Sequence, residues 1–536
     1  MTLVDTQTPI DLDGESLTIA GLRSIAEEQA PCRISRSTHD RVAASRALFQ
    51  EVVDQGTPIY GITTGLGDLV YMMLDRSTEL DFQRNLVRSH AAGVGPVFAE
   101  PESRAMVAAR LNAFAKGYSA VRPELLDRLA LLLNQGIVPA IPEVGSLGAS
   151  GDLAPLAHIA CVVIGEGYVL RDGRPSPTGP VLQQNGIAPL ELRFKEGLSL
   201  INGTSAMTGL GALLVGQALD QVRQAEIITA LVLEALQGSI MPFMAEGHEL
   251  ARPHQGQIDT AANMRTLLRQ SNLAMEHREL REQVVDQRQS NGGHVQKGEV
   301  FIQKAYTLRA IPQVVGAIRD TVYFTTRTVE TELNSANDNP LFFEGSEVFH
   351  GANFHGQPVA FAMDYLTIAL TQLGVMSERR TNRLLNRHLN GGLPEFLVAG
   401  EPGLNSGFTG AQYPATALVA ENRTIGPASI QSVPSNSDNQ DVVSMGLIAA
   451  RNARRVLGNN NLILAVELLS AAQAVDLRKG HERLSPAAKA TYDLVRSLVP
   501  KLDDDRFMSD DIELVAAALD RTEFLSAVRQ DGYDLR

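Results

Sequence analysis

Long stretches of the chain repeat hydrophobic residues at helical spacing. Apolar side chains recur every three or four positions in 39–56, 102–117 and 123–136, and a glycine closes each of these segments. Residues 152–167 and 206–238 are so uniformly apolar that they predict buried helices, the second weakened locally by its own glycines. The remaining long helices are expected over 303–335, 357–390 and 440–475. Helices of this length and apolarity pack on one another as a bundle, so the pattern predicts an all-α fold.

Strand patterns are few. Residues 168–177 hold an Asp-Gly turn and predict a small hairpin, and 341–351 predict another. The polar stretch 276–299 is expected to be a charged helix end that runs into a mobile loop. Mixed short elements give way to long helices near residue 200, which predicts an N-terminal domain over 1–200 and a long-helix region over 201–536.

Composition narrows the class of protein. The formal net charge is −14, so we expect no nucleic-acid partner, although a local basic patch is not excluded. No stretch of about 18 apolar residues is free of charge, so no membrane-spanning helix is expected. The first residues lack the basic and apolar regions of a secretory signal. The two cysteines, Cys32 and Cys161, form neither a disulfide framework nor a metal cluster, which fits the reducing cytoplasm.

Several common catalytic motifs are absent from the sequence. There is no P-loop, no G-x-G-x-x-G after a strand, no H-E-x-x-H and no C-x-x-C. The stretch "GSLGASG" is not a G-x-S-x-G nucleophile elbow, because Ser150 lacks the strand-turn-helix frame. Taken alone, this run of small residues predicts a turn ahead of a helix.

Polar residues inside glycine-rich, apolar blocks are the remaining signal. These residues are Tyr60, His90, Asn202, Tyr306, Arg309, Phe354, His355, Asn436 and Gln440. Each alone is more often a packed or surface side chain than a functional one. Together they supply a base candidate, amides, an aromatic face and a guanidinium. This combination fits a site for a small molecule with a carboxylate, with Arg309 as a bidentate clamp.

The blocks resemble those of a known family. "GSLGASGDLAPL" is similar to the signature of the aromatic amino acid lyases and aminomutases, which include histidine ammonia-lyase. "YGITTGLG", "INGTSAM", "YTLRAIPQVVG", "NSANDNPL", "NFHGQP" and "QDVVSMG" resemble its other blocks in the same order, and the likeness covers about residues 15 to 530. The resemblance implies a histidase-like fold of the fumarase/aspartase-type superfamily. It also implies a homotetramer whose active sites are each built from more than one subunit.

The resemblance also implies a prosthetic group and no metal. In this family the nitrogen of the residue at Gly151 attacks the carbonyl carbon at Ala149, and Ser150 loses its hydroxyl as water. The product is the electrophile 4-methylideneimidazole-5-one (MIO), which forms autocatalytically and would be carried by the N-terminal domain. Glycine offers an unhindered nitrogen and serine a β-hydroxyl that can leave, so the residue types suit the chemistry.

The same resemblance assigns roles to the polar residues. Tyr60 corresponds to the base and Arg309 to the carboxylate clamp, whereas Asn202 and Tyr306 line the prosthetic group. The other roles are ring packing by Phe354 and completion of the polar network by Asn436 and Gln440. Gln440 stands where histidine-specific members usually have an acid, which argues against an imidazole substrate.

His90 and Tyr413 bear on the aromatic ring of the substrate. A His at this block faces the para-hydroxyl of tyrosine in relatives, and a His that donates to a phenol would reject an unhydroxylated ring. Two positions depart from the tyrosine-specific pattern: Leu66 replaces an aromatic residue, and Asp68 stands where Glu is frequent. Both are expected near the ring pocket, so a ring-modified tyrosine is an alternative substrate.

The local pattern is most similar to the bacterial tyrosine 2,3-aminomutases of enediyne antibiotic pathways. It therefore predicts a 2,3-aminomutase that converts tyrosine, or a ring-modified analogue, to a β-amino acid through an aryl acrylate. The first alternative is a tyrosine ammonia-lyase that releases p-coumarate and ammonia. A related helical lyase without MIO would need a "GSSxMPxKxNP" loop, which the sequence lacks. A non-enzymatic helical scaffold would leave the polar blocks unexplained.

Overall fold

A computed structural model describes residues 8–276, 279, 282, 303–345 and 347–536. The described chain is mostly helical with three two-stranded sheets, so the all-α prediction is confirmed. The polar stretch predicted at 276–299 lies almost wholly outside the described residues.

Contacts divide the chain into two units, and neither unit is continuous in sequence. The first unit joins Met1–Gly216, Phe324–Tyr365 and Pro427–Ala453, and the second unit contains the segments between and after them. Each boundary but the one at Pro427 falls inside a long helix. The single domain boundary near residue 200 stays a prediction, since the units interleave along the chain.

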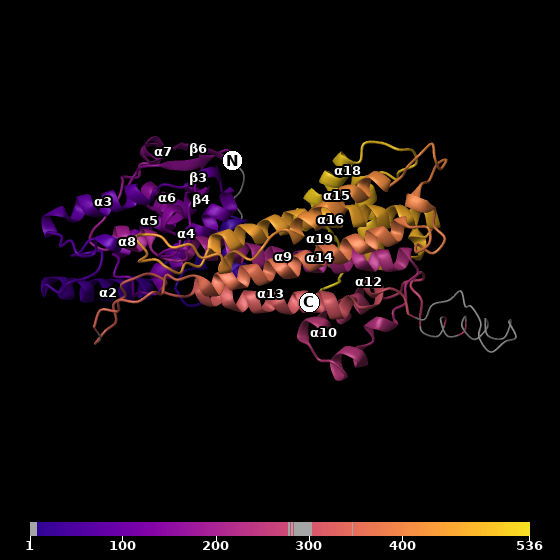
Figure 1. The fold of residues 1–536 in the computed structure, drawn as a ribbon, viewed down its shortest axis with the longest axis horizontal. Helices are drawn as coiled ribbons and strands as arrows, with labels where there is room; N and C mark the ends of the chain where they lie inside the picture. Colours follow the sequence, from indigo (N-terminus) through magenta and orange to yellow (C-terminus); the bar gives the residue numbers. More distant parts are fainter. Residues whose placement is uncertain (1–7, 277–278, 280–281, 283–302, 346) are drawn as a thin grey trace. The chain divides into compact units, whose positions relative to one another are not determined.

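Short elements make up most of the first unit (Figure 1). Its helices are α1 (Ile19–Ala26), α2 (Arg36–Asp54), α3 (Glu79–His90), α4 (Glu100–Ala115), α5 (Pro123–Asn134), α6 (Leu153–Val163), α7 (Thr178–Gln184) and α8 (Glu196–Ile201). Its strands are β1 (Ile10–Asp11), β2 (Cys32–Arg33), β3 (Val94–Val97), β4 (Pro142–Val144), β5 (Tyr168–Arg171) and β6 (Arg174–Pro177). The predicted hairpin at 168–177 is confirmed as the antiparallel pair β5–β6, and Leu341 pairs with Phe349 in a single antiparallel bridge.

Four long helices are shared between the units. They are α9 (Ser205–Ala235), α13 (Ile311–Leu333), α14 (Gln357–Leu385) and α16 (Gly446–Arg478), close to the bounds that the apolar pattern predicts. The other helices of the second unit are α10 (Gln255–Leu267), α12 (Tyr306–Arg309), α15 (Thr409–Arg423), α17 (Pro486–Leu498), α18 (Ser509–Asp520) and α19 (Glu523–Gln530).

Helix α14 is long and apolar enough, by length and composition, to cross a membrane. In the structure 67% of its most apolar window is buried inside the protein. This is the burial expected of a core helix, and the window includes the charged Asp364, whose carboxylate accepts hydrogen bonds from the backbone N–H groups of Ala428 and Ser429.

Three short helices of the first unit pack on one another in pairs. Helices α3, α6 and α8 each contact the other two. His90 is the last residue of α3, Ser150 lies just ahead of α6, and Asn202 directly follows α8. Their packing therefore brings three sequence-distant functional candidates toward one another.

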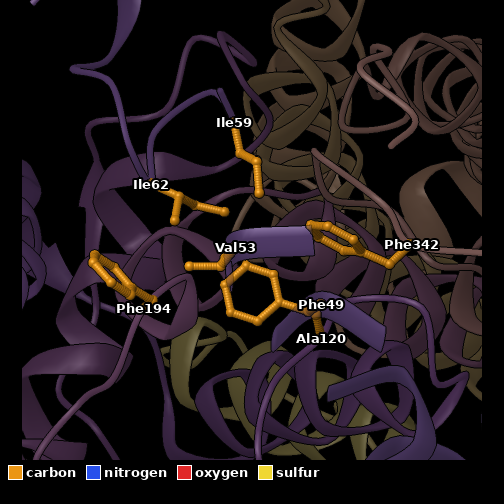
Figure 2. Close-up of a cluster of buried hydrophobic side chains, with 7 residues drawn as sticks. All are labelled: Phe49, Val53, Ile59, Ile62, Ala120, Phe194 and Phe342. Carbon is orange, nitrogen blue, oxygen red and sulfur yellow. The ribbon is translucent and has the colours of Figure 1, made fainter. Parts of the chain in front are cut away.

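A buried hydrophobic cluster anchors the segment that carries Tyr60 (Figure 2). Ile59 and Ile62, on either side of Tyr60, are both 0% exposed and belong to this cluster. Its two most buried rings, Phe49 and Phe342, meet edge to face with centroids 5.2 Å apart. Because burial fixes both Ile59 and Ile62, the backbone between them, which includes Tyr60, has a defined position.

We expect Phe49→Ala to lower the free energy of unfolding by about 3 to 5 kcal/mol, because it leaves a cavity between buried rings. The thermal unfolding midpoint, followed by circular dichroism, measures the effect. Glu51→Ala, an exposed change on the same helix, serves as the control. Equal midpoints for the two variants would contradict the role of the cluster.

Candidate active site

One cavity of about 1150 Å³ lies wholly within the first unit. Sequence-predicted residues on its wall are Tyr60, Leu66, His90, Ala149, Ser150, Asn202, Phe354, His355, Asn436 and Gln440. These residues come from six separate segments of the chain, so the fold gathers most of the predicted site in one place.

The Ala149-Ser150-Gly151 tripeptide has an unusual backbone. Ser150 has a φ of +50° and Gly151 a φ of +78°, both in the left-handed region. A Cβ atom on Gly151 would lie 2.1 Å from the carbonyl oxygen of Gly203, so only glycine fits there. Strained left-handed backbone of this kind persists where the surroundings hold it in place.

Two N–H donors converge on the carbonyl oxygen of Ser150. The side-chain Nδ2 of Asn202 donates to it at 3.1 Å, and the backbone N–H of Gly203 donates at 3.2 Å. A carbonyl that accepts two such bonds is polarised, in the same way as in an oxyanion hole. The side-chain Oδ1 of Asn202 is buried and has no partner among the described residues. It is therefore a buried acceptor whose hydrogen-bonding capacity the described chain leaves unused.

Asp152 fixes the chain directly after the tripeptide. Its carboxylate accepts hydrogen bonds from Ser146 Oγ at 2.8 Å and from the backbone N–H of Met207 at 2.7 Å. Burial away from water raises the pKa of Asp152 to about 6, an effect that these hydrogen bonds only partly offset. The protonated form is thus accessible in mildly acidic solution.

The phenol of Tyr60 is oriented by the loop that follows it. The backbone N–H of Gly67 donates to Tyr60 Oη at 2.8 Å, which stabilises negative charge on that oxygen. Gly67 has a φ of +55°, and a Cβ atom there would lie 2.2 Å from Nδ2 of Asn436. Asn436 and its next two neighbours also have positive φ, and the Asn436 side chain packs closely against the Gly67 loop that holds the Tyr60 hydroxyl.

His90 lines the cavity, and its Nδ1 contacts its own helix. Nδ1 lies 2.9 Å from the carbonyl oxygen of Leu86 and 3.1 Å from Ser89 Oγ, and a hydrogen on Nδ1 would bond to that carbonyl, which can only accept. In the neutral ring, Nε2 is then an acceptor. The expectation that His90 donates to a phenol stays a prediction, and in this tautomer Nε2 would instead accept the phenol O–H.

Gln440 links its own loop to the tripeptide. Its Nε2 donates to Ser150 Oγ at 3.5 Å, and its Oε1 accepts from Ser435 Oγ at 2.8 Å. Sequence analysis missed Asn85, Asn339, His350 and Asn439, which also line the cavity. Asn85 lies one helical turn before Ser89 and His90, and this spacing is the signal that could have revealed it.

Several predicted residues are not on the wall of this cavity. Asp68 is exposed on a short turn and is not among the lining residues. Tyr306, Arg309 and Tyr413 belong to the second unit, where Tyr306 is 70% and Tyr413 68% exposed. The Arg309 guanidinium lies over the Tyr306 ring at 4.6 Å, and its Nε donates to the carbonyl oxygen of Lys304.

The described wall of the cavity lacks a guanidinium or ammonium group to hold a carboxylate. Among the described residues that line it, none is Arg or Lys. The charged ligand group predicted from the sequence needs a partner that this cavity does not itself contain. Elsewhere in the described parts of the chain, no three His, Cys, Asp or Glu side chains gather in a way that could hold a metal ion.

The full chain is similar to proteins that act on aromatic amino acids. Residues 17–497 match the aromatic amino acid lyase family. The chain is 66% identical over 532 residues to a MIO-dependent tyrosine 2,3-aminomutase of Streptomyces globisporus, covering 99% of this chain and 98% of that protein. It is 57% identical over 529 residues to a tyrosine ammonia-lyase of Cupriavidus metallidurans, covering 98% and 99%. A crystal structure of the Streptomyces globisporus tyrosine aminomutase matches with a TM-score of 0.97 at 65% identity, over 99% of this chain and 100% of that chain.

The chain therefore belongs to the aromatic amino acid lyase family, as its blocks predict. Its similarity to a tyrosine aminomutase extends over nearly the whole length of both proteins, in sequence and in fold.

We expect the stability contribution of Asp152 to change between about pH 4 and pH 6. The folded chain holds this proton up to a pKa of about 6, whereas an ordinary Asp loses it near 3.8, so the free energy of unfolding falls as pH rises through that window. The shift corresponds to about 3 kcal/mol. Asp152→Asn resembles the protonated form, since its uncharged amide can still form hydrogen bonds with Ser146 Oγ and the backbone N–H of Met207.

Thermal midpoints across this pH range measure the effect. The advantage of Asp152→Asn over wild type should grow from about pH 4 and level off above about pH 6. Asp172→Asn, at an exposed position, is the control and should show no such trend. A pH-independent difference for Asp152→Asn would contradict the assignment.

Proposed function

We propose that the chain is a MIO-dependent tyrosine 2,3-aminomutase that converts L-tyrosine to β-tyrosine through p-coumarate. The observation that carries the proposal is the doubly hydrogen-bonded Ser150 carbonyl in a cavity that also holds Tyr60 and His90. The 66% identity to a tyrosine 2,3-aminomutase over nearly the full chain supports it.

The tripeptide fits the prosthetic group. Left-handed backbone at Ser150 and Gly151 suits a tight ring, and the close approach of Gly203 leaves no room for a side chain at 151. In forming the group, Gly151 N bonds to the Ala149 carbonyl carbon, whose oxygen leaves as water, and Ser150 loses its hydroxyl and α-hydrogen as a second water. The group supplies an electrophile for the substrate amine. Asn202 and Gly203 would hold the oxygen that it inherits from Ser150.

The chain's own residues handle the substrate. Tyr60, whose Oη accepts a hydrogen bond from the Gly67 N–H, removes the β-proton. The free Oδ1 of Asn202 accepts a hydrogen bond from the substrate ammonium. Nε2 of His90 accepts the phenol O–H, so a ring without a hydroxyl leaves it unpaired. Phe354, Asn436 and Gln440 complete the wall around the ring and the tripeptide.

A second copy of the chain supplies the missing cation. The cavity lacks Arg and Lys among its described lining residues, whereas Arg309 and the exposed Tyr306 and Tyr413 lie in the other unit of the chain. Phe324, Phe361 and Tyr365 form a cluster of partly exposed rings in the first unit, the kind of surface that assembly buries. These features support a homotetramer with shared active sites, in which Arg309 clamps the carboxylate.

Tyrosine ammonia-lyase is the second candidate activity. The 57% identity to a tyrosine ammonia-lyase favours it, and the same cavity serves its first steps. The two activities differ in whether ammonia returns to the β-carbon or leaves. Leu66, which replaces an aromatic residue of the tyrosine-specific pattern, lies on the cavity wall. A ring-modified tyrosine is therefore an alternative substrate. An enediyne pathway and a cytoplasmic location remain expectations from the sequence.

The product mixture from L-tyrosine tests the function. We expect β-tyrosine to accumulate ahead of p-coumarate on a chiral column, and Ser150→Ala, which lacks the hydroxyl that must leave, to form neither. Acrylate and ammonia alone would make the enzyme a lyase. Turnover of a ring analogue but not of tyrosine would overturn the substrate assignment.

His90→Phe should change the choice of ring. Because it removes the acceptor of the phenol O–H, we expect the ratio of kcat/KM for tyrosine over phenylalanine to fall by at least about 100-fold. The matched control is Arg88→Ala, on the same helix as His90, which breaks a surface ion pair between Arg88 and Glu166. An unchanged ratio in His90→Phe would show that His90 does not recognise the ring.

Mixed oligomers test the shared site. Tyr60→Phe and Arg309→Gln should each lose at least about 100-fold in activity. Their co-assembly should recover up to about a quarter of wild-type activity, because some sites then combine intact residues from two chains. Tyr60→Phe mixed with Ser150→Ala is the control, since both changes lie in one cavity and no site regains both residues. Failure of the first pair to recover would exclude a site shared in this way.

A further inference from the structure

A fully buried arginine lies directly behind the tripeptide site. Arg110, in α4, is 0% exposed and forms no ion pair with any carboxylate in the described parts of the chain. Its guanidinium donates to neutral oxygens: the carbonyls of Ser199 and Asn202, the latter at 2.9 Å, together with Asn337 Oδ1 at 2.9 Å and Ser205 Oγ at 3.2 Å. A buried cation without a carboxylate partner is costly, so its retention needs a reason.

One peptide group connects this cation to the tripeptide. The carbonyl of Asn202, which accepts from Arg110, and the N–H of Gly203, which donates to the Ser150 carbonyl, are the two ends of the same amide. Donation to the oxygen of an amide draws electron density from its nitrogen and makes the N–H a stronger donor, as in other hydrogen-bond chains. The positive charge of Arg110 therefore acts on the Ser150 carbonyl through a single peptide.

The close contact between Arg110, the Asn202–Gly203 peptide and the tripeptide depends on glycine. A Cβ atom on Gly203 would lie 2.4 Å from Nη1 of Arg110 and 2.7 Å from Oδ1 of Asn337. On the other side, Gly151 packs against Gly203 with equally little room. Any side chain at 203 would separate Arg110 from the peptide that it contacts.

Arg110 keeps its charge in this place. Burial lowers its pKa to about 10, while the charges of Asp338 and Asp152 act in the opposite direction. The guanidinium is therefore protonated at neutral pH. Asp338 is itself paired with the buried Lys195 at 2.6 Å, so it does not neutralise Arg110.

We propose that Arg110 is a positioning residue that polarises the Ser150 carbonyl through the Asn202–Gly203 peptide and so raises the reactivity of the electrophile formed there. The inference rests on the proposed function, because it assumes that the tripeptide becomes an electrophilic group. The same polarisation makes the α-hydrogen of Ser150 more acidic, which assists its loss with the hydroxyl.

Arg110→Gln tests the inference, with Arg104→Gln as the matched control. Arg104 lies on the same helix, is 2% exposed and also donates to backbone carbonyls, those of Ile25 and Leu133. In the described parts of the chain, neither Ile25 nor Leu133 forms a hydrogen bond with the tripeptide. Both variants therefore remove a buried guanidinium, and only one removes the connection to Ser150.

The readout is trapping of the electrophile by cyanide, which adds with a proton across an exocyclic double bond and needs no substrate. Peptide mass gives the extent of water loss from the tripeptide and of cyanide addition. We expect Arg110→Gln to react at least about 10-fold more slowly than wild type or to retain the two waters, and Arg104→Gln to match wild type. Wild-type water loss and trapping rate in folded Arg110→Gln would overturn the inference.

Chemical rescue separates charge from packing. In Arg110→Ala, guanidinium at a concentration far below that which unfolds proteins should restore trapping, whereas urea, neutral and of similar shape, should not. Equal rescue by both would show that Arg110 only fills space. If Arg110→Gln or Arg110→Ala fails to fold, Arg110→Lys and Arg110→Met give the same comparison. The charged Lys variant should trap cyanide faster than the neutral Met variant, and equal trapping rates in the two would contradict the relay. Wild-type protein that loses no water from the tripeptide would instead refute the proposed function itself.

Discussion

The hydrogen bonds to the carbonyl oxygen of Ser150 are the interaction on which the candidate site depends. Two donors, the Asn202 side chain and the Gly203 N–H, come from one short segment after α8. They can meet the tripeptide only because α6 and α8 pack together and because glycine at 151 and 203 lets two backbones touch. A polarised carbonyl, a fixed backbone and a place for an electrophile follow from the same contact.

The other functional groups are held by parts of the fold that do no chemistry. Burial of Ile59 and Ile62 fixes the backbone at Tyr60, and the Leu86 carbonyl in the last turn of α3 contacts the ring of His90. Packing and a backbone contact thus orient these two side chains. Such preorganisation is what allows weak groups, such as a phenol or a neutral imidazole, to act on a bound amino acid.

One cavity supplies most of the groups for the reaction and lacks one of them. Its described wall has acceptors, amides and aromatic surface but no cation, whereas Arg309 and its stacked Tyr306 lie in the other unit. Under the proposed homotetramer, a second copy of the chain would supply this group, and the exposed Tyr306 and Tyr413 would be covered by assembly.

The long helices, the family and the candidate residues Tyr60, His90 and Asn202 could be predicted from the sequence, because apolar periodicity and family blocks are local properties of the chain. Hydrogen-bond partners and burial followed from tertiary packing alone. Packing places the Leu86 carbonyl against the ring of His90, and it places Arg110, a polar residue in a helix with a largely apolar pattern, directly behind the tripeptide. Both depend on which backbone atoms approach from distant segments, and that information lies in the packing of helices rather than in any stretch of sequence.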